Sequence, residues 1–123
     1  MKNRLVKSAL LLCVLGIASL ALAQSEKVTI KGYLMDKMCS AQILKSKDAQ
    51  ADARRHTREC AEECAGSGFG VIAGDKYYLF DQKGNELAKS MLKTTKKADS
   101  LSVEVTGTLQ DNTIKVESLK EVD

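Results

Sequence analysis

Apolar and polar residues alternate at three places along the chain, and each place predicts a β-strand. The first strand is expected at 28–36, and the last two at 101–109 and 114–117. A tight Asp111-Asn112 turn joins the last two, because residues of this type favour turns between alternating segments. Such alternation is typical of a sheet that packs one face on a core and leaves the other in water.

Two further elements lie between these strands. A hairpin is predicted from strands at 69–73 and 76–81, which a Gly74-Asp75 turn separates. A helix is predicted to follow it, with Asn85 as its N-cap and its end near Ala98, because apolar residues recur there at helical spacing.

Residues 40–66 are expected to form a helical insertion directly after the first strand. Ser40 is the predicted cap of a short turn that ends at Leu44. The sequence Ser46-Lys47-Asp48 then offers an N-cap for one continuous helix that reaches about Ala65, where Gly66 ends it.

The predicted order is strand, helical insertion, strand, strand, helix, strand, strand. This order predicts a mainly β fold with α+β content, in which five strands form an OB-fold-like barrel. The Cys- and His-bearing insertion then lies between strands 1 and 2, and the second helix lies between strands 3 and 4. A general α+β sheet is the alternative architecture.

The first 23 residues are expected to be a cleaved secretory signal peptide. A basic start with Lys2, Arg4 and Lys7 precedes a short apolar run, and the run ends in Ala21-Leu22-Ala23. The run is shorter than the ~20 residues that a membrane-spanning helix needs, so no permanent anchor is expected. Residues 24–123 then form a single domain that is exported to the periplasm or secreted.

Charge argues against a nucleic-acid partner. The chain has 19 basic and 16 acidic residues, and removing the three basic residues of the signal leaves 16 of each. Binding to a phosphate backbone needs an excess of Lys and Arg, which the mature chain lacks. We therefore expect the partner to be a metal ion, a protein or a small ligand.

The candidate site lies in the stretch from Cys39 to Cys64, which holds three of the four cysteines and the single histidine. On one continuous helix, small or metal-ligating residues recur every three or four positions and form one stripe, namely Ala49, Ala53, His56, Cys60 and Cys64. Cys39 can close the set from the end of the first strand. An ordinary amphipathic helix carries Leu or Ile at such positions, so the stripe favours a chemical role.

The first interpretation is a metal site formed by Cys39, His56, Cys60 and Cys64. Three sulfurs and one imidazole suit tetrahedral zinc, and thiolates also suit Cu(I). The role is then binding or structural, and no enzymatic activity is expected.

Two other interpretations use the same cysteines. A disulfide from Cys39 to Cys60 or to Cys64 is predicted to clip the insertion to the barrel of a module that binds a protein or small ligand. Cys60 to Cys64 is disfavoured, because Cβ atoms one helical turn apart are about 5–6 Å from each other. A thiol redox protein is the third possibility, since His56 lies one turn before Cys60 and can lower its pKa.

Several motifs together resemble a group of small exported bacterial OB-fold proteins. These motifs are G-Y-L-M-D-K-M-C at the end of the first strand, H-T-R-E-C-A-E-E-C-A in the insertion, and G-V-I-A-G-D-K-Y-Y-L-F in the hairpin. The resemblance spans nearly all of residues 24–123. It implies export and the barrel, and it implies no particular activity.

Overall fold

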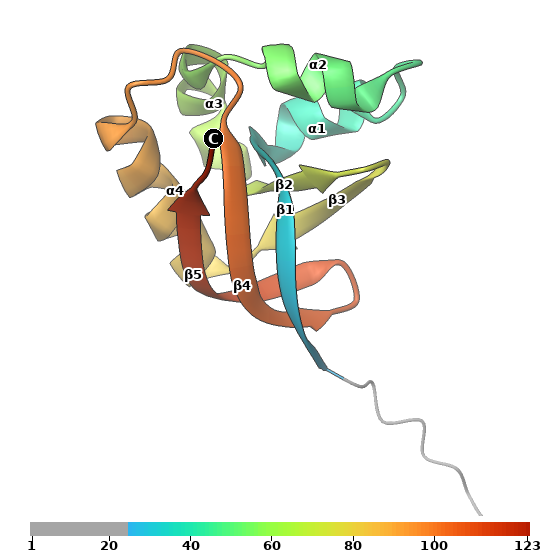
Figure 1. Ribbon diagram of the computed structural model, residues 1–123, viewed down its shortest axis with the longest axis vertical. Coiled ribbons are helices and arrows are strands. Elements are labelled where there is room, and N and C mark those ends of the chain that lie inside the picture. The colour runs from blue at the N-terminus through green and yellow to red at the C-terminus, as the bar shows by residue number, and fades with distance from the viewer. Residues whose placement is uncertain (1–24) are drawn as a thin grey trace, which may run out of the picture.

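The computed structural model describes residues 25–123 as a five-stranded mixed sheet with helices, an α+β arrangement that is mostly β (Figure 1). The strands are β1 (Glu26–Asp36), β2 (Phe69–Ala73), β3 (Lys76–Phe80), β4 (Ser102–Gln110) and β5 (Thr113–Glu121). The helices are α1 (Lys37–Ile43), α2 (Ala49–Arg55), α3 (Arg58–Glu63), the 3₁₀ turn η1 (Ala65–Ser67) and α4 (Gln82–Thr94). The predicted signal peptide lies outside the described residues.

The strand order β1-β2-β3-β5-β4 closes on itself, because β1 pairs with both β2 and β4. All pairs are antiparallel except β3 with β5, which run parallel. The long strand β1 makes this possible, since its first eight residues pair with β4 and its end, from Tyr33 to Asp36, pairs with β2. The predicted strands and the two predicted hairpins are confirmed.

The core lies inside the sheet and under α4. The alternating faces of β4 and β5 bury Val103, Val105, Ile114 and Val116, and α4 adds Ala88 and Leu92. A Cβ atom added at Gly84 would lie 2.5 Å from Val116 Cγ2 and 2.6 Å from Phe80 Cβ, so only glycine lets α4 pack this closely. Burial of this apolar surface is the main force that holds the fold together.

The predicted continuous helix in the insertion is wrong: it is broken at His56 and Thr57 into α2 and α3. The break is stabilised by bonds to the loop before β4. The Arg58 N–H donates to the Ala98 carbonyl at 2.8 Å, and the Ser100 N–H donates to the Arg54 carbonyl at 2.9 Å. Each half has its own cap, Asp48 on α2 and Thr57 on α3, so the stripe predicted along one helix does not form.

The predicted N-caps of α1 and α4 are also wrong. Asp36 rather than Ser40 caps α1, and Asp81 rather than Asn85 caps α4. Asn85 instead accepts the Phe69 N–H at 2.8 Å, which ties α4 to the start of β2. Helix α4 ends at Thr94, four residues before the predicted end.

The three helices of the insertion gather at one end of the sheet, while α4 lies along its side next to β5 (Figure 1). The insertion therefore sits over the end of β1, where Asp36 lies and α1 begins. Among the described residues, every helix is too short or too polar to cross a membrane.

Candidate functional site

The buried carboxylate of Asp36 is the centre of the candidate site. Asp36 is the last residue of β1 and is fully buried. Its Oδ2 accepts the backbone N–H of Cys39 at 2.8 Å and so caps α1. Asp36 is not among the site residues that the sequence analysis predicted. The local signal that could have found it is the cap itself, since Asp is a preferred residue before a helix.

His56 reaches Asp36 because the chain is extended where α2 ends. The backbone of His56 has φ −64° and ψ 127°, so the chain turns there instead of continuing the helix. Its imidazole Nε2 lies 3.1 Å from Asp36 Oδ1, and only 6% of the side chain is exposed. The helix break that the sequence did not predict is therefore what delivers the imidazole to the carboxylate.

This pair leaves buried polar atoms without a properly directed partner. Within residues 25–123, neither ring nitrogen of His56 makes a hydrogen bond of good geometry, and neither does Asp36 Oδ1. A buried polar group that lacks such a bond costs about 1–3 kcal/mol. Either the imidazole carries a proton on Nε2 and faces Asp36 Oδ1 as a donor, or the two lone-pair atoms 3.1 Å apart repel unless a cation lies between them. The pair can thus be joined by a proton or by a bound cation.

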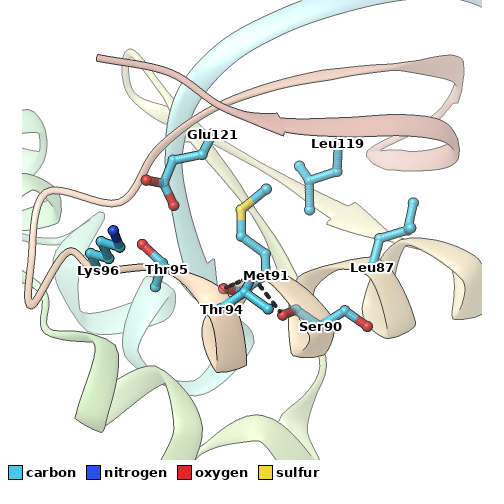
Figure 2. Close-up of a pocket in the computed structure, with 8 residues that line it drawn as sticks. All are labelled: Leu87, Ser90, Met91, Thr94, Thr95, Lys96, Leu119 and Glu121. Carbon is cyan, nitrogen blue, oxygen red and sulfur yellow. Dashed lines mark hydrogen bonds between the residues drawn. The ribbon is translucent and has the colours of Figure 1, made fainter.

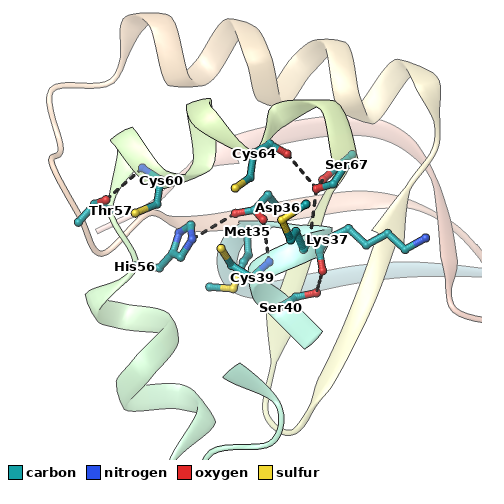
Figure 3. Close-up of polar contacts among 12 residues, drawn as sticks. Met35, Asp36, Lys37, Cys39, Ser40, His56, Thr57, Cys60, Cys64 and Ser67 are labelled. Atoms are coloured by element: carbon teal, nitrogen blue, oxygen red, sulfur yellow. Dashed lines mark hydrogen bonds and ion pairs between the residues drawn. The ribbon is translucent and has the colours of Figure 1, made fainter. Parts of the chain in front are cut away.

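Cys39 completes a compact group of donor atoms. The carboxylate of Asp36, the thiol of Cys39 and the imidazole of His56 each offer one atom, and these atoms all lie within 4.8 Å of one another. Figure 3 shows the side chains of Cys39, Cys64 and His56 directed to the same region around Asp36.

The other two cysteines differ in position. Cys64 is the C-cap of α3 and is half-buried, whereas Cys60 is exposed on α3. Within the described residues, all three cysteines are free thiols, and Cys60 and Cys64 lie outside the compact group. That they ligate a metal stays a prediction.

Burial determines the ionisation of the site. It raises the pKa of the Cys39 thiol to about 12, and the neighbouring Asp36 charge acts in the same direction. Burial lowers the pKa of His56 from its ordinary value, although Asp36 opposes this. A neutral imidazole is the form that binds metals, and a bound cation deprotonates a coordinating thiol.

Two further hydrogen bonds lie on either side of Asp36 in the chain. The Tyr77 hydroxyl donates to the Met35 carbonyl at 3.2 Å, and burial raises the pKa of this tyrosine. The hydroxyl of Ser40 donates to the Lys37 carbonyl at 2.7 Å. These bonds restrain the backbone that carries Asp36.

A separate pocket of about 510 Å³ lies between α4 and β5 (Figure 2). Its lining combines apolar and hydroxyl side chains with one charge of each sign, namely Leu87, Ser90, Met91, Thr94, Thr95, Lys96, Leu119 and Glu121. It contains neither cysteine nor histidine. This pocket therefore offers none of the sulfur or imidazole donors that lie around Asp36.

Comparison with known proteins gives no match: no family model, no curated protein and no solved structure matches the chain. The resemblance to small exported bacterial OB-fold proteins stays a prediction. Function is therefore argued from the geometry around Asp36.

Proposed function

We propose that the protein is a non-catalytic metal-binding protein that holds one zinc or copper ion beside Asp36. The observation that carries this proposal is the group of Asp36, Cys39 and His56, whose donor atoms lie within 4.8 Å of one another. The buried Oδ1 of Asp36 and the ring nitrogens of His56 lack well-directed hydrogen-bond partners, and this supports the proposal. A cation bound between the two side chains would satisfy a polar atom of each. Cys64, whose thiol faces Cys39, is the proposed fourth ligand (Figure 3).

The donor set favours zinc over copper. One carboxylate, one imidazole and two thiols form a mixed set of four, and zinc accepts oxygen, nitrogen and sulfur in a tetrahedron. Cu(I) prefers sulfur ligands, so a carboxylate at the centre of the site suits it less well. In the proposed set of ligands, Asp36 replaces Cys60, which the sequence analysis included and which is exposed.

We also propose that the sheet is an OB-fold and that the protein works outside the cytoplasm. The closed strand order, the helix between β3 and β4, and the insertion between β1 and β2 support the fold. The basic, apolar and small-residue pattern of residues 1–23 supports export. In this proposal the insertion covers one end of the barrel and carries the ion.

The direct test is zinc affinity of the full-length protein, kept reduced and measured by competition with a chromophoric chelator. Asp36→Asn keeps an oxygen that can accept the Cys39 N–H, but it removes the anionic donor. We expect the wild type to bind one zinc ion per chain and Asp36→Asn to bind at least tenfold more weakly. The same titration with Cu(I) ranks the two metals.

Asp48→Asn is the matched control. Asp48 also caps a helix through its side chain, accepting the Ala51 N–H at 3.0 Å, but it is exposed and is not part of the donor group around Asp36. Its substitution should leave zinc affinity unchanged. Reduced wild-type protein that takes up neither metal would overturn the proposal and leave Asp36 and His56 as a structural pair.

A further inference from the structure

Strand register brings Cys39 and Cys64 together. In the antiparallel pair of β1 and β2, Asp36 lies opposite Phe69. The residues that follow Asp36 therefore run beside the residues that precede Phe69. Cys39 comes three positions after this pair and Cys64 five positions before it, so the two approach from opposite chain directions. Cys60 lies a further turn away on α3.

Hydrogen bonds hold these two segments side by side. The Lys37 N–H donates to the Gly68 carbonyl at 2.9 Å. The Ser67 hydroxyl accepts the Met38 N–H at 3.2 Å and donates to the Cys64 carbonyl at 2.8 Å. One hydroxyl thus bridges the residue next to Cys39 and the backbone of Cys64 itself.

The side chains of Cys39 and Cys64 both lie beside Asp36 (Figure 3). Figure 3 shows the Cys39 and Cys64 side chains on either side of the Asp36 carboxylate, with Cys60 turned toward His56. The Cys64 thiol is close enough to interact with the Cys39 thiol. Both residues are half-buried.

We propose that Cys39 and Cys64 form a reversible redox pair, and that their disulfide and a bound metal ion exclude each other. The inference rests on the proposed function, because both states use the same two sulfurs. A disulfide removes two thiolate ligands and leaves only Asp36 and His56, which are too few for tetrahedral zinc. Oxidation therefore releases the ion, and reduction restores the site.

The oxidant is a low-molecular-weight disulfide such as glutathione disulfide. One cysteine thiolate attacks a glutathione sulfur, the glutathione S–S bond breaks, and one glutathione leaves as a thiolate that takes up a proton. The second cysteine thiolate attacks the mixed disulfide, forms the Cys39–Cys64 bond and expels the second glutathione. In sum, two protein thiols lose two electrons and two protons, and glutathione disulfide gains them.

The experiment treats the reduced full-length protein with glutathione disulfide, with and without one equivalent of zinc. Digestion with trypsin and a glutamate-specific protease separates the three cysteines, because Glu62 and Glu63 lie between Cys60 and Cys64. Mass spectrometry then identifies the linked peptides, and chelator competition measures zinc in the same samples. Cys60→Ser is the control that keeps the pair, and Cys64→Ser removes it.

We expect a Cys39–Cys64 linked peptide in the wild type and in Cys60→Ser, at least tenfold weaker zinc binding after oxidation, and slower oxidation when zinc is bound. Zinc binding by the reduced protein together with a Cys39–Cys60 link, or with no link, overturns this inference and leaves the proposed function intact. Oxidised protein that keeps its zinc affinity overturns it too. Reduced protein that binds no zinc overturns the proposed function, and the inference with it.

Discussion

Asp36 caps α1 through Oδ2 and faces His56 through Oδ1. Two substitutions at this position can test these two roles separately. Asp36→Ala removes both oxygens and leaves the Cys39 N–H without its acceptor. Loss of such a cap costs about 0.5–2 kcal/mol of unfolding free energy. Asp36→Asn keeps an acceptor oxygen, and since Asn and Asp cap about equally well, it should cost less than about 0.5 kcal/mol.

Zinc binding should produce a second, independent difference in unfolding free energy, this time between the wild type and Asp36→Asn. A ligand at 100 times its dissociation constant stabilises the folded protein by about 2.7 kcal/mol, and a tenfold weaker site gains only about 1.4 kcal/mol at the same zinc concentration. We therefore expect Asp36→Asn to match the wild type in a chelator but to gain at least about 1.3 kcal/mol less from zinc.

Urea unfolding of the reduced proteins, followed by circular dichroism in chelator and in zinc, measures both effects. Equal stabilisation of the wild type and Asp36→Asn by zinc would refute the assignment of Asp36 as a ligand. An Asp36→Ala protein as stable as Asp36→Asn in chelator would refute the capping role. Asp48→Asn serves again as the exposed control.

Three further substitutions test separate parts of the structure. Thr57→Ala removes the oxygen that accepts the Cys60 N–H at 3.1 Å; urea unfolding should show a loss of about 1 kcal/mol, which Thr57→Ser restores. Gly84→Ala inserts a methyl group 2.5 Å from Val116; overpacking should cost about 1–3 kcal/mol despite better helix propensity, and thermal unfolding measures it. Cys60→Ser should leave zinc affinity in chelator competition within about twofold of the wild type, because an exposed side chain outside the donor group adds little. A loss of tenfold or more would indicate that Cys60 is a zinc ligand.

The strands were predictable from sequence because alternation has a period of two and needs only local information. The paired runs around Gly74-Asp75 and Asp111-Asn112 predicted both hairpins, and the structure has them at β2–β3 and β4–β5. Helix α4 was predicted as well, although its cap and its end were displaced by a few residues. In these elements local preference and tertiary packing agree.

The candidate site was predicted only in part, because long-range contacts build it. Residues 49–65 contain neither glycine nor proline, so the local sign of the break at His56 and Thr57 is limited to Thr57, a residue type that favours N-caps. Bonds from Arg54 and Arg58 to the loop before β4 create that break, and sequence spacing does not reveal them. The burial of Asp36 likewise depends on β1, α1 and the insertion coming together.

The central claim is that the ion is held by a mixed set of sulfur, nitrogen and oxygen donors around Asp36. X-ray absorption at the zinc edge of the reduced, zinc-loaded full-length protein tests it directly. The proposed ligands predict two sulfurs at about 2.3 Å and two nitrogen or oxygen atoms at about 2.0–2.2 Å. A shell of three sulfurs and one nitrogen, or a shell without sulfur, would contradict the proposed site.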